Sequence, residues 1–273
     1  MQRPAKPFTP VRFRIQPPNI MKVAIIGYGF VGEALSSAFK KNVQIFKVDP
    51  KLKTTIKDLK SFKPNVIFLC LPTPMMDNGS QDVSILTNSL EKLLENKVGG
   101  LIVVKSTVHP GNINLIKKIQ PKLIYNPEFL REKYAKEDFI NSKLIVFGGE
   151  REECKYLSNV YKKYTNCVCN DHIFTDAQSA SMIKYTINSF LATKVIFFNE
   201  LYQLFNQMDS NETWENFISY IAKDTRIGES HMMVPGHDGR YGFGGACLPK
   251  DASAIVHFAN NMSVELNILK KTI

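Results

Sequence analysis

The stretch KVAIIGYGFVGEALSSAFKK, residues 22–41, constrains the fold of this chain more than any other feature. An apolar run with β-strand composition ends at Gly27, and a helical pattern follows the glycine turn. Similar strands recur as VQIFKVD, PNVIFLCLP, GLIVVKST, KLIYNP and SKLIVFGG, with helices expected at about 83–94 and 113–119. Apolar strands that alternate with helices predict a doubly wound parallel sheet, with helices on both faces, over residues 21–170.

Beyond residue 170 the alternation stops. The segment DAQSASMIKYTINSFLATKVIFFNELYQLFNQ keeps a helical period for about thirty residues, which is long for a globular helix. A second helix is expected at about 213–223, and a third begins near Asp251. The predicted fold class is therefore α/β, with an N-terminal Rossmann-like domain at 21–170 and an all-helical domain at 171–273. Residues 1–20 are rich in proline and arginine and are expected to form a flexible tail, or to be translated from an upstream start.

Composition excludes several classes of protein. The chain has 273 residues, 44% of them hydrophobic, and its net charge is +10. Its lysines are scattered, which argues against nucleic-acid binding but suits an anionic small molecule that carries a diphosphate. No apolar run approaches about 18 residues, so no membrane span is expected, and no signal peptide is evident.

The cysteines indicate a reducing, cytoplasmic setting, because their number, five, is odd and they show no disulfide spacing. Cys167 and Cys169 alternate in NCVCN, which resembles a strand. A metal site there would need partner ligands that the sequence does not offer, so no metal is predicted.

The glycine turn GYGFVG fits the fingerprint of a dinucleotide-binding site. Gly27 allows the tight turn, Gly29 lets the main chain approach a pyrophosphate, and Gly32 lets the helix pack on the strand. Asp49 lies 22 residues after Gly27, at the end of the second strand, where a carboxylate holds the ribose hydroxyls and repels a 2′-phosphate. The predicted cofactor is NAD, and its predicted contacts in this region are Gly27, Tyr28, Gly29, Phe30, Val31, Gly32 and Asp49.

Polar side chains directly follow three further strands, at the edge of the sheet where such folds bind ligands. Thr73 follows the third strand and Thr107 the fourth, and both are candidates for cofactor contacts. Glu128 and Glu132 follow the fifth strand and are four residues apart, so they share a face if EFLRE begins a helix. Taken alone, this pair is more typical of an exposed helix face than of a site.

A cluster of small residues surrounds Cys247 in YGFGGACLPKD, residues 241–251. Glycines cost conformational entropy on folding, and a chain accepts that cost where its backbone must approach something closely. Cys247 is either a buried structural thiol or a nucleophile that faces a ligand. Lys184 and Asn188, four residues apart in the long helix and flanked by apolar residues, favour a site when they are taken together with the strand ends.

The motifs GYGFVG, LPTP, KSTVHPG, YNPEFLRE, KYTINSFLATKVIFFNE and GFGGACLPKD occur in this order. From about Met21 to its end the chain resembles the UDP-glucose/GDP-mannose dehydrogenase family, and NPEFLRE and GGACLPKD are its most distinctive motifs. The resemblance implies an NAD-dependent nucleotide-sugar 6-dehydrogenase, with UDP-glucose as the expected substrate. Such enzymes oxidise a primary alcohol to a carboxylate with two NAD molecules and release no free aldehyde.

The resemblance also implies roles for individual residues. Cys247 is the nucleophile that forms a thiohemiacetal and then a thioester. Asp251 and Thr107 position the water or proton acceptor of the first oxidation. Lys184 steadies the developing oxyanion by charge, and Asn188 does so by a hydrogen bond.

Four more residues receive roles by the same resemblance. Glu132 assists hydrolysis of the thioester as a base, and Glu128 holds the sugar or the loop. Lys250 contacts the cofactor. Arg226 reaches the substrate of a partner subunit, because the long helix in this family builds a homodimer.

One departure from the family leaves three hypotheses open. Family members continue past GGACLPKD into a second α/β domain that grips the nucleotide, whereas this chain ends at Ile273. The first hypothesis is an active four-electron dehydrogenase, as a compact dimer or with a separate chain that supplies the missing C-terminal domain. The second is a truncated, inactive NAD-binding remnant or a partner of a full-length enzyme. The third is a two-electron dehydrogenase of the β-hydroxyacid kind, which needs no cysteine. The retained set of candidate catalytic residues favours the first.

Overall fold

The computed structural model describes residues 20–245 and 247–273. The predicted flexible tail, residues 1–20, lies outside the described residues except for its last position. The strands of the described part are β1 (Lys22–Ile26), β2 (Gln44–Val48), β3 (Val66–Leu69), β4 (Leu101–Val104), β5 (Leu123–Tyr125), β6 (Val146–Gly148) and β7 (Ile173–Thr175). They form one seven-stranded sheet in the order β2-β1-β3-β4-β5-β6-β7.

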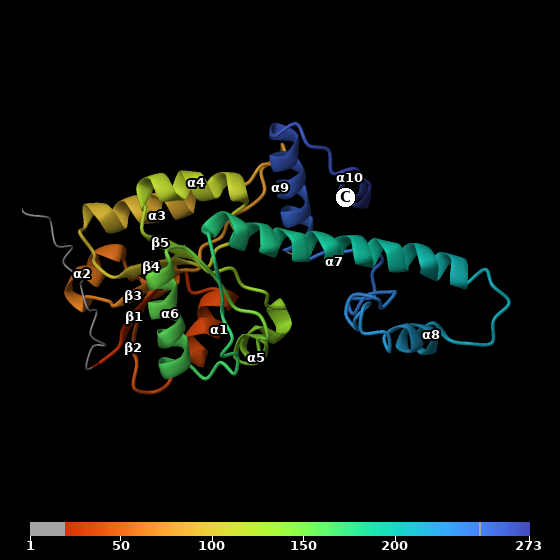
Figure 1. The fold of residues 1–273 in the computed structure, drawn as a ribbon, viewed down its shortest axis with the longest axis horizontal. Helices are drawn as coiled ribbons and strands as arrows, with labels where there is room; N and C mark the ends of the chain where they lie inside the picture. The colour runs from red at the N-terminus through yellow and green to blue at the C-terminus, as the bar shows by residue number, and fades with distance from the viewer. Residues whose placement is uncertain (1–19, 246) are drawn as a thin grey trace, which may run out of the picture.

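The helices divide into two groups. Those of the sheet domain are α1 (Phe30–Ala38), α2 (Leu59–Phe62), α3 (Ser84–Glu95), α4 (Pro110–Ile119), α5 (Ala135–Ile140) and α6 (Arg151–Tyr164), with the 3₁₀ turns η1 (Pro50–Leu52), η2 (Ile56–Asp58) and η3 (Glu132–Tyr134). Those that follow the sheet are α7 (Ala177–Phe205), α8 (Trp214–Ile221), α9 (Leu248–Asn261) and α10 (Asn267–Thr272). The described chain thus has the predicted order, a Rossmann-like domain and then a helical one (Figure 1).

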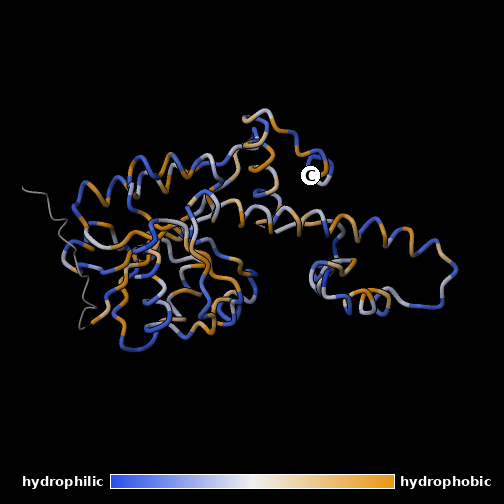
Figure 2. Tube along the Cα trace, viewed as in Figure 1, coloured by the Kyte–Doolittle hydropathy of each residue, from blue (hydrophilic) through white to orange (hydrophobic). Residues whose placement is uncertain are grey.

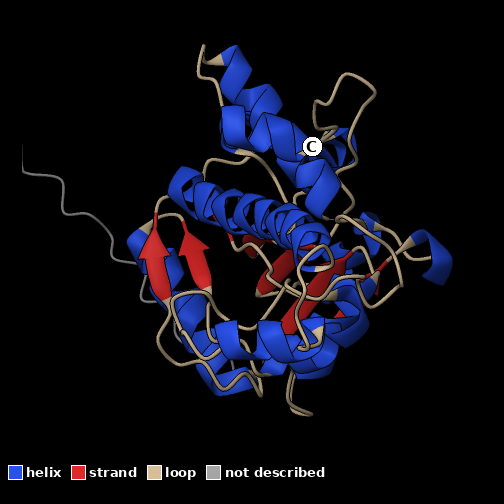
Figure 3. Cartoon of the chain, turned by 90° about the vertical axis from the view of Figure 1, so that its right-hand side faces the viewer, coloured by secondary structure: helices blue, strands red, loops and turns tan. Residues whose placement is uncertain are grey.

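Alternating side chains of the strands bury the sheet on both faces. Val23 and Ile25 of β1 pack in one cluster with Leu35 of α1, whereas Ala24 and Ile26 pack in the opposite cluster, which contains residues of α3 and α4. Each of these four β1 residues is buried. The helices therefore lie on both sides of the strands, as Figure 3 shows. This is the doubly wound arrangement that the continuous apolar strands predict.

The long helix α7 joins the sheet to the helical part. Asp176 begins it, because its Oδ1 accepts a hydrogen bond of 2.9 Å from the Ser179 main-chain N–H. Ala177 and Ala180 belong to the core of the sheet. The helix then leaves the sheet, and Figure 1 shows it passing α9 and extending towards α8.

Two smaller apolar cores hold the helical part on α7. Tyr185 packs with Ala252, Ile255 and other residues of α9, which fixes the first turns of α9 against α7. Further along, Phe198 packs with a cluster from α8 and the loop that follows it: Trp214, Ile218, Met232 and Val234. Along the sequence, Cys247 lies between Val234 of the second core and Ala252 of the first.

Several local expectations differ from the structure. The segment NCVCN is not a strand, and the short strand β7 instead extends the sheet past the predicted boundary at residue 170. The strand β6 pairs antiparallel with β5, while the other pairs are parallel. The segment EFLRE does not begin a helix, because it is irregular up to η3. Among the described helices, none has the length and apolar character needed to cross a membrane.

Candidate active site

The three glycines after β1 have three different reasons to be glycine. Gly27 has φ +89°, and a Cβ there would lie 2.4 Å from the carbonyl oxygen of Cys70. A Cβ on Gly32 would lie 2.2 Å from the carbonyl oxygen of Gly27, so only glycine lets α1 pack this closely. A Cβ on Gly29 would meet no atom of the described residues within 4 Å. The turn is therefore tight, closely packed and open on one side, which fits a pyrophosphate above the N-terminus of α1.

Asp49 lies directly after β2 and faces this turn. Its Oδ2 accepts a hydrogen bond of 2.8 Å from the main-chain N–H of Tyr28, and its Oδ1 accepts one of 2.9 Å from Lys51. The hydrogen bond from Tyr28 holds the pKa of the Asp49 carboxyl below its ordinary value. A carboxylate is thus present at neutral pH where the fingerprint requires an acceptor for ribose hydroxyls.

The ends of β3 and β4 bring Thr73 and Thr107 together. Thr73 donates its hydroxyl proton to the carbonyl oxygen of Thr107 over 2.7 Å, and both residues are buried. The two segments LPTP and KSTVHPG therefore meet at one edge of the sheet, as parallel strand ends must.

A buried ion pair joins the loop after β5 to α7. Lys184 Nζ lies 3.3 Å from Glu128 Oε1, and the two side chains are 3% and 6% exposed. The other carboxylate oxygen of Glu128 accepts a hydrogen bond of 2.6 Å from the main-chain N–H of Leu130. Removing one partner of such a pair typically costs about 3–5 kcal/mol, because the other charge is left buried without compensation.

A second buried contact joins α7 to α9, one turn further along. Asn188 Nδ2 donates to Asp251 Oδ2 over 2.6 Å, and Asp251 is fully buried. Lys250 donates to the other carboxylate oxygen of Asp251. The main-chain N–H of Asp251 in turn bonds to the carbonyl oxygen of Cys247, over 3.0 Å. Asp251 and the main chain of Cys247 are thereby held beside α7, one turn from the Lys184 that pairs with Glu128.

Cys247 lies at the N-terminus of α9 and is only half-buried. Burial raises the pKa of its thiol above the ordinary value, and the negative charge of Glu128 raises this pKa further. The cations of Lys184 and Lys250 act in the opposite direction. The charge of Asp251 also raises this pKa, so the reactivity of the Cys247 thiol depends on the charges that surround it.

Two predicted site residues do not join this cluster. Glu132 is exposed in η3 and is not on a shared helix face with Glu128. Arg226 is also exposed, and its guanidinium forms a two-bonded pair with Asp224, at 3.0 and 2.6 Å. The roles given to both residues stay predictions. Of the two glutamates, Glu128 is the one that faces Lys184.

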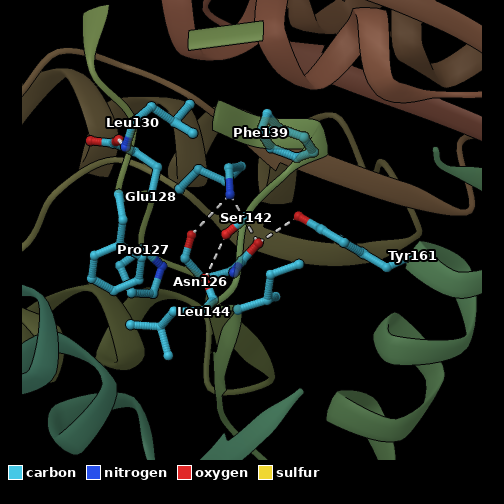
Figure 4. Close-up of a pocket in the computed structure, with 11 residues that line it drawn as sticks. Asn126, Pro127, Glu128, Leu130, Phe139, Ser142, Leu144 and Tyr161 are labelled. Carbon is cyan, nitrogen blue, oxygen red and sulfur yellow. Dashed lines mark hydrogen bonds between the residues drawn. The ribbon is translucent and has the colours of Figure 1, made fainter. Parts of the chain in front are cut away.

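Lys105 belongs to the site region but was missed by the sequence analysis. It is 3% exposed at the end of β4, and its Nζ donates to Asn126 Oδ1 over 3.0 Å. Tyr161 donates to the same oxygen over 2.6 Å, and these side chains line a cavity of about 20 Å³ together with Glu128 (Figure 4). That volume is about enough for one water molecule. The available signal was a lysine at the end of the apolar run LIVVK.

This arrangement unites the groups that alcohol and aldehyde oxidation need. A thiol, two ammonium groups, two carboxylates and an amide converge from the β5 loop, α7 and α9. No group of three or more possible metal ligands occurs in the part of the chain that the structure describes. A thiol can add to a carbonyl carbon, and an ammonium group can offer positive charge to the carbonyl oxygen.

Comparison with protein families gives two matches along the chain. Residues 47–165 match the NAD binding domain of the UDP-glucose/GDP-mannose dehydrogenase family, and residues 178–273 match the central domain of the same family. These two ranges lie on either side of the junction between the sheet and α7. They include every predicted catalytic residue.

Similar proteins support the same assignment. The UDP-glucose 6-dehydrogenase of Rickettsia conorii is 33% identical over 77% of this chain, but the match covers 48% of that protein. This chain therefore spans about half the length of this relative. The UDP-glucose dehydrogenase structure from Pyrobaculum islandicum has a TM-score of 0.76 at 24% identity, over 94% of this chain and 68% of that one. The 3-hydroxyisobutyrate dehydrogenase of Mycobacterium tuberculosis has a TM-score of 0.68 at 15% identity, over 93% and 91% of the two chains. Both structural likenesses show a shared fold alone.

The charges around Cys247 predict how its alkylation depends on pH. Because the pKa of the thiol is raised, the thiolate fraction is small at neutral pH, and the rate of alkylation by iodoacetamide still climbs above about pH 9. Lys184→Met removes a cation that lowers this pKa, so the variant reacts more slowly at every pH below the plateau. The rate is measured by mass spectrometry of the peptide that contains Cys247.

Lys194→Met is the matched control, because Lys194 is a second buried lysine on α7 that bonds the carbonyl oxygens of Ile227 and Gly228 instead. It should leave the rate at Cys247 within about twofold of the natural protein. An equal slowing in both variants would show that packing of α7, and not the charge of Lys184, governs the thiol.

Proposed function

We propose that this chain, which belongs to the UDP-glucose/GDP-mannose dehydrogenase family, oxidises the primary alcohol of a nucleotide sugar to a carboxylate at Cys247. The chain carries the NAD-binding domain of the family, and its glycine turn and Asp49 fit that cofactor. The observation that carries the proposal is the convergence of Cys247 with Lys184, Glu128 and Asp251 on one face of α7.

The first oxidation removes a hydride and a proton from the alcohol. NAD, when bound, accepts the hydride in each of the two oxidations. The Asp251 carboxylate takes the hydroxyl proton, directly or through a water positioned with Thr107. Asn188 supports this role because its amide holds one carboxylate oxygen of Asp251 in place. Lys184 offers its positive charge to the oxygen as the carbonyl forms.

The second half of the reaction uses the thiol. The sulfur of Cys247 adds to the aldehyde carbon, and the thiol proton moves to the carbonyl oxygen, which gives a thiohemiacetal. Loss of a second hydride and of the hydroxyl proton converts it to a thioester. Water then attacks the thioester carbon, so the carboxylate leaves and the thiol is restored.

A carboxylate is needed to activate that water. The family resemblance gives this task to Glu132. Its side chain is exposed in η3 and would have to move towards the thioester on Cys247. Glu128 is buried beside Lys184 and acts on the charge state of Cys247, which supports a role for it next to the reacting carbon. We assign Glu128 to the sugar end of the site, and Glu132 stays the proposed base.

UDP-glucose is the substrate that we propose first. The relatives with about one-third identity are named UDP-glucose 6-dehydrogenases. The diphosphate of a nucleotide sugar suits a chain with a net charge of +10.

A homodimer through α7 is part of the proposal. Phe190 and Phe197 on this helix are 63% and 54% exposed, and Leu204 is 59% exposed. Figure 2 shows apolar residues recurring along α7 after it leaves the sheet. A second copy of the helix would bury these side chains, and it would bring the exposed Arg226 within reach of a partner's substrate.

Counting NADH separates the three hypotheses. Protein mixed with NAD and limiting UDP-glucose should form two NADH per sugar, measured at 340 nm, with GDP-mannose and N-acetylhexosamine nucleotides as alternative substrates. Cys247→Ser should lose turnover but keep NAD binding, because the second oxidation needs the sulfur. Cys169→Ser is the control, since Cys169 lies in the coil before β7.

Each other outcome favours an alternative. One NADH per sugar, or full turnover in Cys247→Ser, would favour a two-electron dehydrogenase of the β-hydroxyacid kind. NAD binding without turnover on any of these sugars would favour the remnant or a partner of a full-length enzyme.

The dimer is tested by sedimentation equilibrium. Phe190→Asp should weaken self-association at least tenfold, because a charge would replace a ring that only the dimer buries, and each tenfold corresponds to about 1.4 kcal/mol. Val168→Asp, which alters an equally exposed residue away from α7, should leave the association unchanged. A monomeric natural protein would refute the dimer.

A further inference from the structure

Buried side chains bond four main-chain polar groups in the loop between β4 and α4, all of them between Thr107 and His109. The carbonyl oxygen of Thr107 accepts two hydrogen bonds, from the Thr73 hydroxyl at 2.7 Å and from Gln81 Nε2 at 2.9 Å. The N–H of His109 donates to Gln81 Oε1 over 3.1 Å. Gln81 therefore binds the main chain on both sides of Val108.

Val108 itself is bonded at both of its main-chain groups. Its N–H donates to the hydroxyl oxygen of Tyr125 over 3.1 Å. Its carbonyl oxygen accepts from the hydroxyl of Ser181, which lies on α7. These bonds leave the loop little freedom, because breaking one would leave a buried polar group without a hydrogen-bond partner, at a cost of about 1–3 kcal/mol.

Gln81 uses its whole amide in this network. Nε2 donates to Thr107 O and, over 3.0 Å, to the hydroxyl oxygen of Tyr185 on α7. Oε1 accepts from His109 N and, over 3.3 Å, from Asn112 Nδ2 on α4. Its side chain is 8% exposed, so these four bonds satisfy both donors and both acceptor positions of the amide without solvent.

Gln81 links Thr107, a predicted site residue, to Tyr185, which lies on α7 in the turn between Lys184 and Asn188. Thr107 is at one end, and its own hydroxyl makes no hydrogen bond with the described residues. Tyr185 is at the other end, buried against α9. It packs with Ala252, the residue after Asp251. Burial raises the pKa of Tyr185, and the negative charge of Asp251 raises it further.

We propose that Gln81 is a positioning residue that fixes Thr107 relative to the buried face of α7. Its amide ties the β4–α4 loop of the sheet domain to Tyr185 of the helical domain, so the unbonded hydroxyl of Thr107 is held at a set distance from the groups around Asp251. This inference rests on the proposed function, because the role of Thr107 belongs to it. No motif points to Gln81, which precedes the helix α3 by three residues.

Two variants separate the donor and acceptor halves of the amide. Gln81→Met loses all four bonds with little change in size. Gln81→Glu keeps an acceptor for His109 and Asn112, but an ionised carboxylate cannot donate to Thr107 or Tyr185. Gln178→Met is the matched control, because Gln178 also bridges α7 and α4, donating to Asn114 over 3.2 Å, but at an exposed position.

Amide hydrogen exchange tests the inference without turnover. In the peptide that covers residues 104–112, Gln81→Met should exchange at least tenfold faster than the natural protein, while Gln178→Met and the peptide 22–30 should not change. Unchanged exchange at 104–112 overturns the proposal. Hydrogen exchange tests the role of Gln81 even if the natural protein forms no NADH. The absence of NADH would refute the proposed function and leave the inference about Gln81 open to this test.

Turnover distinguishes positioning from simple support of the fold. If the protein is active, both Gln81 variants should lower kcat at least tenfold and weaken NAD binding by a smaller factor, since none of the four bonds of Gln81 reaches the glycine turn or Asp49. The kcat of Gln81→Glu, divided by that of the natural protein, should rise as the pH falls from about 8 to about 6, because a protonated carboxyl can again donate to Thr107. Faster exchange with unchanged kcat overturns the proposal, as does a loss of NAD binding equal to the loss of kcat.

Discussion

The buried polar face of α7 is the constraint on which the site depends. Lys184 meets Glu128 from the loop after β5, and Asn188 meets Asp251 from α9. Charges this deeply buried must keep their partners, because separation would leave an uncompensated charge in the interior. The two contacts therefore fix three segments that are distant in sequence, and the position of Cys247 at the start of α9 follows from them.

The chemistry of Cys247 follows from the same balance of charges. Burial and Glu128 keep the thiol protonated, whereas Lys184 and Lys250 favour the thiolate. A thiol in this state is largely unreactive at rest, and a change in the charges around it alters its reactivity. The ion pair of Lys184 with Glu128 thus stabilises the packing and also sets the state of the nucleophile.

Much of this architecture was predictable from the sequence, because it rests on repeated local patterns. The apolar strands, the glycine turn and the helical period of α7 each leave a direct signal, and the structure and the family comparison confirm the fold class. The strand β7 was missed because it is three residues long and half exposed, without an apolar run. NCVCN alternates like a strand but lies in coil before it.

The remaining errors concern residues whose role depends on tertiary contacts. EFLRE has helical composition, but Glu128 turns its carboxylate to the N–H of Leu130 and to Lys184, which holds the segment in an irregular path. Gln81 lies in none of the recognised motifs, and Lys105 is the first residue of KSTVHPG but received no role there. The Asn126 partner of Lys105 lies 21 residues away, and the partners of Gln81 lie between 26 and 104 residues away. Such long-range bonds leave no local signal that sequence reasoning can detect.

The central claim is that the glycine turn and Cys247 serve one reaction centre. A crystal structure of the protein with NAD tests this most directly. The account predicts a pyrophosphate against the main chain at Gly29 and the ribose hydroxyls on Asp49. It also predicts that the nicotinamide points towards Cys247, with room between them for one sugar carbon within about 3–3.5 Å of each reacting atom. A nicotinamide directed away from Cys247, or shielded from it by the chain, would contradict the account.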